Sequence, residues 1–328
     1  MTRRRALALL GAAALSAPVR AVAQTASKKP RRVAMLSPVA DEVRFARLRA
    51  ELLKLGYVEG RDIEFEIRTA DGQFERMPAL AAELAGDGKV DALIAVSTPV
   101  ATALERATQT IPIIAYIAVD PVAAGLAKSL ARPGGNVTGV AFLAPELNAK
   151  RVELLHEIAP NARRIAAIAG ETSTSVNSPG NFAAVDEAGR RLGLSVDIVV
   201  VDDPGKLGET LTPTVLAGFD GFVVLPDILF WSRAAELAAL FSASGKPGIY
   251  TDRHFVEAGG LISLGSNLVG GYERVAAQLD RVLKGTQPGD IPFELPRSFE
   301  LLVNLRAARA GGIAVPESAV VRADEVIE

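Results

Sequence analysis

Apolar and polar residues follow two periods along this chain, and the pattern predicts strands that alternate with helices. The runs Ala92–Val96 and Ile113–Ala118 are short and almost wholly apolar, which is typical of strands buried on both faces of a parallel sheet. Residues 42–55 show the three-and-four spacing of a helix with one buried face, made by Phe45, Leu48, Leu52 and Leu55. Strands that alternate with helices predict parallel sheets with helices on both faces.

The same alternation runs through most of the chain in two series. About five expected strands precede Ala144 and about four follow it, which predicts two similar lobes in tandem rather than one sheet. After residue 260 the pattern gives two further strands, 261–264 and 299–303, and a helix over 271–283. We expect these late elements to pass back between the lobes and to form a hinge.

The segment from Tyr116 to Phe142 predicts a strand, a helix and a second strand. Asp120 stands at the position of an N-cap and Pro121 at the first helical position, so a helix is expected to follow. Because Asp120 comes directly after a predicted parallel strand, it lies where open α/β sheets bind ligands. The alternative is that Asp120 only caps its helix.

The first residues have the composition of an export signal. Arg3–Arg5 is a positive start, Ala6–Val19 is an apolar run too short to span a bilayer, and Ala21–Ala23 has the small residues of a cleavage site. We therefore expect residues 1–23 to be a signal peptide, and residues 24–30 to be a polar leader. The paired arginines resemble a twin-arginine signal, whose cargo crosses the membrane folded.

Composition and charge narrow the class of protein. The chain contains no cysteine, so it has no disulfide framework and no thiol for lipid attachment, and we expect a soluble protein of the periplasm. Its formal charge is −2, and removal of residues 1–23, which hold four arginines and no acidic residue, would make it −6. A mildly acidic protein is a poor nucleic-acid binder.

Few residues support an enzyme. The two histidines, His156 and His254, have no metal-ligand partner at helical spacing, and the chain has no phosphate loop, nucleophile elbow or dinucleotide fingerprint. We expect no cofactor, no metal and no reaction. The alternative is a secreted α/β hydrolase that uses Asp120 and His254.

Six segments carry a resemblance to a known family. They are LGYVEGRDIEFEIR (55–68), PALAAELA (78–85), DPVAAGLAKSLARPGGNVTGV (120–140), KRVELLHEIAP (150–160), HFVEAGGLISLG (254–265) and RADEVIE (322–328). In their order and wording these segments resemble the ABC-transporter substrate-binding proteins of the tryptophan/tyrosine-transporter-like family. The resemblance extends over residues 31–328.

The resemblance implies an α/β protein with a type I periplasmic-binding-protein fold, in which two Rossmann-like lobes with parallel sheets are joined by a hinge of three crossovers. By this analogy residues 31–143 plus 266–285 form the first lobe, and residues 144–265 plus 286–328 form the second. The implied function is that of the periplasmic component of an ABC importer. Such a protein, expected to be a monomer, captures a small amino-acid-like or organic acid ligand and delivers it to an ABC permease in the cytoplasmic membrane.

The resemblance also implies a cleft lined by strand ends. The matching positions are Ser37, Ser97, Thr98, Asp120, Asp227 and Tyr250. Thr172 lies in a Ser/Thr-rich loop, 170–175, where many relatives have an Asn/Pro-rich one, so the identity of the ligand stays open.

The residue types at these positions suit a small zwitterionic ligand. Ser97 and Thr98 begin a predicted helix, whose free N–H groups make a seat for a carboxylate. Asp120 and Asp227 are able to hold an ammonium group, and Trp231 and Tyr250 are able to contact a ring or an aliphatic chain. The alternative for both aromatic residues is packing in the core, and Asp227 is equally able to cap a short helix.

Overall fold

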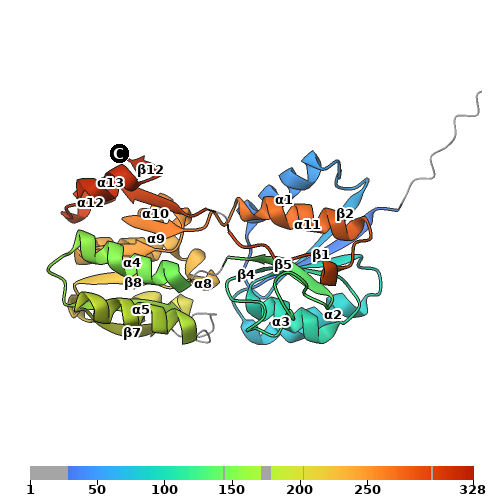
Figure 1. The fold of residues 1–328 in the computed structure, drawn as a ribbon, viewed down its shortest axis with the longest axis horizontal. Coiled ribbons are helices and arrows are strands. Elements are labelled where there is room, and N and C mark those ends of the chain that lie inside the picture. The colour runs from blue at the N-terminus through green and yellow to red at the C-terminus, as the bar shows by residue number, and fades with distance from the viewer. Residues whose placement is uncertain (1–28, 143–144, 171–178, 202, 297) are drawn as a thin grey trace, which may run out of the picture.

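A computed structural model of the protein describes residues 29–142, 145–170, 179–201, 203–296 and 298–328. The strands form two separate sheets, and each sheet is the centre of one lobe (Figure 1). Among the described residues, no helix combines the length and the apolar character that crossing a bilayer requires.

The first sheet has five strands in the order β2-β1-β3-β4-β5, and every neighbouring pair is parallel. Its strands are β1 (Arg31–Ser37), β2 (Ile63–Thr69), β3 (Ala92–Val96), β4 (Ile113–Ile117) and β5 (Val137–Ala141). Helices cover both faces: α1 (Glu42–Lys54), α2 (Met77–Gly86) with the short turn η1 (Phe74–Arg76) before it, α3 (Thr98–Ala107) and the late helix α11 (Gly271–Leu283). Figure 1 shows α11 beside α1, although more than 200 residues separate them in the sequence.

The second sheet has seven strands in the order β12-β11-β10-β9-β8-β6-β7. Its strands are β6 (Arg164–Gly170), β7 (Ser195–Val201), β8 (Gly221–Val224), β9 (Gly248–Tyr250), β10 (Ile262–Gly265), β11 (Glu300–Asn304) and β12 (Glu325–Ile327). The prediction of parallel strands holds except at β10 and β11, which are antiparallel.

The helices of the second lobe lie on both faces of this sheet (Figure 1). They are α4 (Pro145–Ile158), α5 (Pro179–Leu192), η2 (Pro204–Lys206), α6 (Leu207–Thr210), α7 (Pro213–Ala217), α8 (Ile228–Trp231), α9 (Ala234–Ser244), α10 (Arg253–Glu257), α12 (Leu305–Gly311) and α13 (Glu317–Arg322). Residues 207–217 form the two short helices α6 and α7 rather than one helix, because Pro213 begins a new helix capped by Thr212.

The two lobes share one topology. The order β2-β1-β3-β4-β5 in the first sheet recurs as β7-β6-β8-β9-β10 in the second. In such doubly wound sheets the order reverses beside the first strand, and ligands bind at the carboxyl ends of the strands on either side of that point. For this protein those ends belong to β1 and β3 in one lobe and to β6 and β8 in the other.

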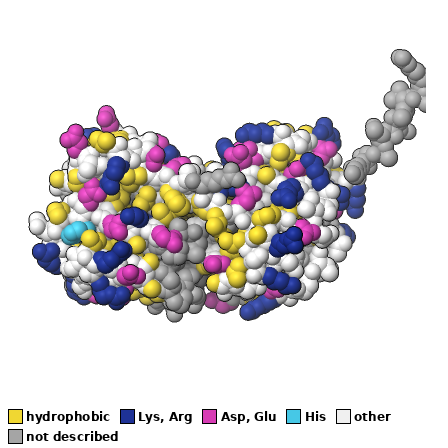
Figure 2. Space-filling model, in the orientation of Figure 1, with side chains coloured by type: hydrophobic (Ala, Val, Ile, Leu, Met, Phe, Trp, Pro, Cys, Tyr) yellow, Lys and Arg dark blue, Asp and Glu magenta, His cyan; other side chains and the backbone are white. Residues whose placement is uncertain are grey.

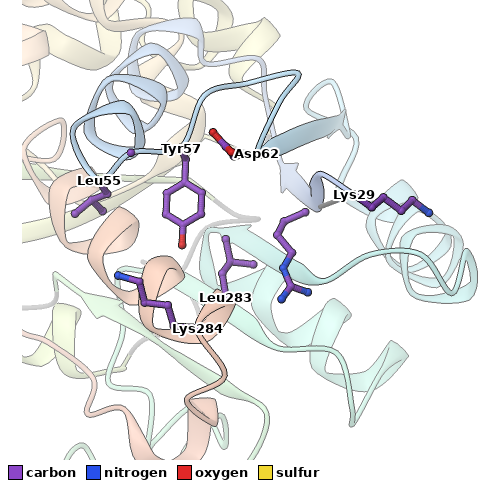
Figure 3. A pocket seen from close by; sticks show the side chains of 8 residues that line it. Lys29, Leu55, Tyr57, Asp62, Leu283 and Lys284 are labelled. Carbon is purple, nitrogen blue, oxygen red and sulfur yellow. The ribbon is translucent and has the colours of Figure 1, made fainter. Parts of the chain in front are cut away.

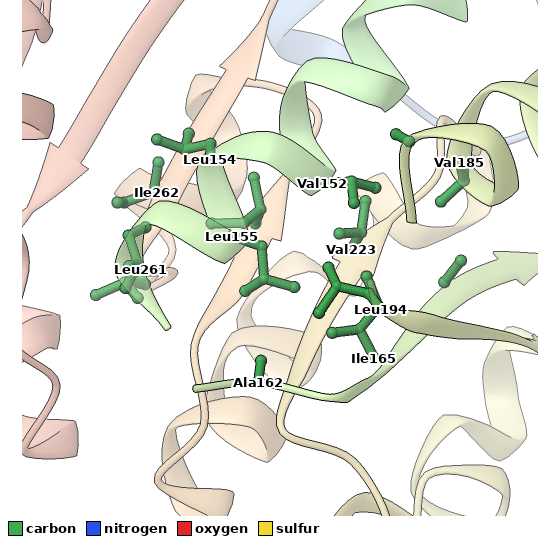
Figure 4. Close-up of a cluster of buried hydrophobic side chains, with 14 of the residues drawn as sticks. Val152, Leu154, Leu155, Ala162, Ile165, Val185, Leu194, Val223, Leu261 and Ile262 are labelled. Carbon is green, nitrogen blue, oxygen red and sulfur yellow. The ribbon is translucent and has the colours of Figure 1, made fainter. Parts of the chain in front are cut away.

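Each sheet lies between two apolar layers. In the second lobe, Val152 and Leu155 of α4 pack on Ile165 of β6 and Val223 of β8, and all four side chains are fully buried (Figure 4). Burying an aliphatic side chain of this size contributes about 1.5–3 kcal/mol. The sheets are therefore rigid supports for the loops at their carboxyl ends.

The helix expected after Asp120 is not formed. Residues 121–125 make a series of turns, in which the amides of both Leu126 and Ala127 donate to the Pro121 carbonyl. Gly125 has a φ of +74°, a left-handed conformation that ends any helical continuation. The prediction was wrong because the Ala/Leu-rich composition favours a helix, whereas Gly125 takes a conformation that stops one.

The expected lobe boundary after Gly285 is also displaced. The amide of Phe293 donates to the Leu130 carbonyl and the amide of Glu294 to the Gly139 carbonyl, while Ile291 and Phe293 lie in the apolar layers of the first sheet. Residues up to about 295 therefore belong with the first lobe, including the turn η3 (Pro288–Asp290).

Candidate ligand-binding site

The carboxyl ends of the two sheets face each other. Helix α1 follows the carboxyl end of β1, and α8 follows the carboxyl end of β8. The guanidinium carbon of Arg44, in the first turn of α1, lies 4.1 Å from the centroid of the Trp231 ring at the end of α8. The loops that follow these strands thus meet between the lobes, where the topology predicts a ligand.

Ser97 is strained at the start of α3. It is a non-glycine residue with φ 103° and ψ 158°, a region of backbone space that is used essentially by glycine. Its side chain makes no capping hydrogen bond, although Ser97 occupies the N-cap position. Strain of this kind persists where the surrounding structure imposes it, and it is concentrated at functional sites.

The two hydroxyls at this helix start have no hydrogen-bond partner among the described residues. Ser97 Oγ and Thr98 Oγ1 are buried and make no hydrogen bond in the described structure. The first amides of a helix also lack intrahelical acceptors, and Pro99 removes one of them. Two hydroxyl donors and the positive end of α3 therefore converge beside β3, an arrangement that suits a carboxylate.

Ser37 uses its hydroxyl differently. It lies at the carboxyl end of β1 with 1% of its surface exposed, and its Oγ donates to the Val39 carbonyl over 2.7 Å. This bond shapes the turn that leads to Asp41, the N-cap of α1. Ser37 thus holds the loop in place, and its hydroxyl retains acceptor capacity only.

Asp227 lies at the carboxyl ends of β6 and β8, where the strand order of the second sheet reverses. A side-chain carbon at Gly170, the last residue of β6, would come within 2.0 Å of Asp227 Oδ2. Glycine at position 170 therefore gives the Asp227 carboxylate its place over the end of β6. Asp227 is partly buried and follows β8, which matches its expected position at a strand end.

Trp231 is covered on both faces. The His254 ring stacks on it with 3.8 Å between ring centroids and 21° between planes. Arg44 lies over the same ring, and two groups this close to one centroid occupy opposite faces. The expected stacking of a ligand ring on Trp231 is therefore blocked. The indole Nε1 is buried and has no hydrogen-bond partner in the part of the chain that the structure describes, so the ring edge is the part that offers a contact.

Buried charges surround this stack, and the sequence pattern did not reveal them. Arg44 is 2% exposed and pairs with Asp41, which lies one helical turn away, with 3.0 Å between Nε and Oδ2. On the second lobe Asp252 is 5% exposed; burial raises the pKa of its carboxyl, and Arg44 acts in the opposite direction. In the sequence, Arg44 lies beside the apolar face of α1. A charged residue at such a position normally points into solvent, so the pattern did not indicate that Arg44 is buried.

Arg151 is a second buried cation near the hinge. Its Nε donates to the Leu264 carbonyl over 2.8 Å, and burial lowers its pKa to about 10. Asp252 raises that pKa and so helps to keep the guanidinium charged. Arg151 thereby ties α4 to the end of β10, close to where the chain leaves the second lobe.

Three further expected site residues differ in their placement. Tyr250 is 1% exposed and packs between Phe241 and Phe255, and its hydroxyl lies back along the strand near Gly248, so the packing alternative fits it better. Asp120 is exposed, and its Oδ1 accepts from the amide of Val122 at 2.7 Å, which caps a turn rather than a helix. Thr172 lies outside the described residues.

The hydrolase alternative finds no support in the contacts of its two residues. His254 Nε2 lies 3.0 Å from the Trp231 carbonyl oxygen, and its ring face is covered by the indole. Asp120 Oδ1 is used by the turn amides. Within the described residues, no cluster of His, Asp or Glu side chains is arranged to hold a metal ion.

A cavity of about 470 Å³ lies elsewhere, at the amino end of the first sheet (Figure 3). Its lining includes Arg31, Tyr57, Asp62 and Lys284. Four of its polar side chains are paired within the protein: Tyr57 and Lys284 both bond to Asp280, Arg31 to Asp91, and Asp62 to Arg61. Burial and the Asp280 carboxylate raise the pKa of Tyr57 to about 12.

The surface in Figure 2 shows acidic and basic side chains interspersed over both lobes, with no single basic stripe on that face.

The chain matches known proteins over most of its length. A family model described as "ABC transporter substrate binding protein" matches residues 38–327. A tyrosine-binding protein of Clostridioides difficile is 27% identical over 290 residues, which cover 86% of this chain and 81% of that protein.

Two solved structures are informative about the arrangement. The crystal structure of an ABC domain in complex with L-Trp from Streptococcus pneumoniae is 25% identical, with a TM-score of 0.82, and the match covers 91% of this chain and 100% of that one. The ligand-free, open structure of a substrate binding protein from Clostridium difficile is 24% identical with a TM-score of 0.64, over 91% and 99% of the two chains. On the strength of the match over residues 38–327, this chain belongs to the family of ABC transporter substrate binding proteins.

Proposed function

We propose that this protein is the periplasmic receptor of an ABC importer and binds a small amino-acid-like or organic acid ligand between its lobes. The observation that carries the proposal is the start of α3, where a strained Ser97 leaves two buried hydroxyls unpaired. A protein that only needed a helix there would use the Ser97 side chain as a cap.

The ligand carboxylate would bind at this helix start. Hydrogen bonds to a charged group contribute about 1.5–3 kcal/mol each, and a partly buried helix N-terminus adds up to about 2 kcal/mol. Micromolar affinity requires about −8 kcal/mol. The first lobe alone therefore supplies a large part of the binding energy, and the remainder must come from the second lobe.

The second lobe offers groups of complementary type. Asp227 stands at the carboxyl end of β8 and would attract an ammonium group, and the Trp231 Nε1 would donate to a ligand oxygen. Asp120, exposed after the end of β4, would contact a ligand from the first lobe. A ligand that bridges both lobes stabilises their closed arrangement.

The relatives suggest which ligands to test first. Tyrosine is the ligand named for the Clostridioides difficile relative, and L-Trp is bound in the Streptococcus pneumoniae structure. Both amino acids carry the carboxylate and ammonium groups that these positions suit.

The remaining parts of the proposal concern the setting. Residues 1–23 would direct export of the protein. Their paired arginines would act as a twin-arginine signal. The mature monomer would carry its ligand unaltered to a permease in the cytoplasmic membrane. No catalytic step is proposed, since the site groups described above position a ligand and do not form a nucleophile and base pair.

A thermal-shift panel with matched variants tests the proposal. A ligand at about 100 times its Kd should add about 2.7 kcal/mol of stability. Ser97→Ala and Asp227→Asn should each reduce this shift for L-tyrosine or L-tryptophan. The controls are Ser244→Ala, at the end of α9, and Asp220→Asn, at the amino end of β8, and both should preserve the shift. A ligand that stabilises all four variants equally would place binding elsewhere and refute the proposed site.

A further inference from the structure

Arg44 makes a contact between the lobes with groups that belong to the protein alone. Its guanidinium comes from α1 of the first lobe, and the Trp231 and His254 rings that it meets belong to α8 and α10 of the second. We call these three residues the inter-lobe stack. A guanidinium over a tryptophan face is the most favourable form of cation–π contact, and it is stronger when both groups are shielded from water. Arg44 and Trp231 are 2% and 8% exposed.

The position of Arg44 is fixed from the first lobe. Asp41 Oδ1 accepts from the Arg44 amide at 3.1 Å, and Asp41 Oδ2 lies 3.0 Å from Arg44 Nε. The N-cap of α1 therefore also orients the side chain that reaches the second lobe. This double use of Asp41 limits the guanidinium to one direction and lowers the entropy lost when the lobes meet.

The second lobe is built to receive this cation. His254 covers the far face of Trp231, and His254 Nε2 lies 3.0 Å from the Trp231 carbonyl oxygen, so ring and backbone are held together. Asp252, which caps α10 through the amide of His254, adds a buried carboxyl whose interaction with Arg44 is favourable. The Arg44 guanidinium is thus oriented by residues of the first lobe, and the Trp231 ring is oriented by residues of the second lobe.

We propose that Arg44 is a positioning residue that stabilises the closed arrangement of the lobes through the inter-lobe stack, and that ligand affinity depends on it by this route. The inference rests on the proposed function, because closure matters only for a receptor that binds between its lobes.

The chain offers a matched control for this contact. Arg49 lies 4.0 Å over the Phe45 ring, but both residues belong to α1, so this second cation–π contact lies within one lobe. Arg49→Ala removes a contact of the same kind without affecting closure. Arg44→Lys keeps the charge but lacks the planar group that stacks on an indole, so it should restore the effect only in part.

Trp231 is the single tryptophan of the chain, so its fluorescence reports on the inter-lobe stack directly. In purified protein without ligand, Arg44→Ala should increase acrylamide quenching of Trp231 and the radius of gyration from X-ray scattering, while Arg49→Ala changes neither. Trp231→Leu removes the second-lobe partner of the same contact, so it should raise the radius of gyration as Arg44→Ala does. Because removing Arg44 leaves Asp41 buried without its partner, the Trp231 variant keeps the test valid if Arg44→Ala folds poorly.

Affinity provides the second measurement. With L-tyrosine as the probe, Arg44→Ala should weaken binding about tenfold, the effect of losing one shielded cation–π contact from the closed state. Unchanged quenching in Arg44→Ala, together with unchanged scattering in Arg44→Ala and Trp231→Leu, would overturn the proposal. A loss of affinity in Arg44→Ala without those changes would make Arg44 a direct ligand contact instead. If the wild type binds neither L-tyrosine nor L-tryptophan, the proposed ligand class fails, while the two ligand-free measurements still decide the role of the stack.

Discussion

Replacing Ser97 with glycine should stabilise the protein and weaken its ligand binding at the same time. The φ and ψ of Ser97, 103° and 158°, lie in a region that costs a non-glycine residue about 1–3 kcal/mol. Glycine adopts this conformation freely, but it loses about 0.5–1 kcal/mol more backbone entropy than alanine on folding. The expected gain in the free energy of unfolding is therefore about 1 kcal/mol, or a rise in Tm of about 2–4 °C.

The same substitution removes the hydroxyl that we assign to the ligand. Losing one hydrogen bond to a charged group costs about 1.5–3 kcal/mol, which weakens binding by at least about tenfold. Ser97→Ala separates the two effects, because alanine keeps the side-chain carbon that causes the strain but lacks the hydroxyl. It should bind as weakly as Ser97→Gly without gaining stability.

Differential scanning calorimetry measures the stability, and isothermal titration with the best ligand of the panel measures the affinity. The reasoning requires Ser97→Gly to unfold at a higher temperature than both the wild type and Ser97→Ala. If the glycine variant is the least stable of the three, Ser97 is not strained and its conformation is no sign of function.

Two further predictions follow from contacts around the sheets. Gly170→Ala should leave the fold intact but weaken ligand binding several-fold, because the new carbon would lie 2.0 Å from Asp227 Oδ2 and force that carboxylate to move. Titration calorimetry measures the affinity, and an unchanged affinity would exclude Asp227 from the site. Asp220 accepts from the backbone amides of Arg163 and Arg164, which lower its pKa. Its folded pKa is thus below the unfolded value of about 3.9, so its contribution to stability is present above that pH and is lost as the pH falls through the folded pKa. Asp220→Asn should therefore be less stable than the wild type at pH 7, and urea titrations should find this difference shrinking below about pH 4; a difference independent of pH would contradict the assignment.

The regular parts of the fold could be predicted because their signals are local. Buried parallel strands such as β3 and β4 are continuous apolar runs, and α11 has apolar residues on one face only. The strain at Ser97 could not be predicted, since Ser-Thr-Pro reads as an ordinary N-cap followed by proline. Backbone conformation at one residue depends on the strands and loops that surround it.

The inter-lobe stack shows where local pattern stops being informative. Arg44 looks like a solvated charge on an amphipathic helix, yet the second lobe buries it. Its partner Trp231 is nearly 190 residues away in the sequence, and no periodicity connects the two. Tyr250 shows the opposite case: a strand end suggested a ligand contact, but its ring turns back into the core.

A crystal structure of the protein with the best ligand of the panel would test the central claim most directly. The account predicts that the unaltered ligand lies between the lobes, with its carboxylate within hydrogen-bonding distance of Ser97 Oγ or Thr98 Oγ1 and with a second-lobe contact at Asp227 or Trp231. A ligand bound in the cavity near Tyr57 and Lys284, or found between the lobes with its carboxylate away from α3, would contradict it.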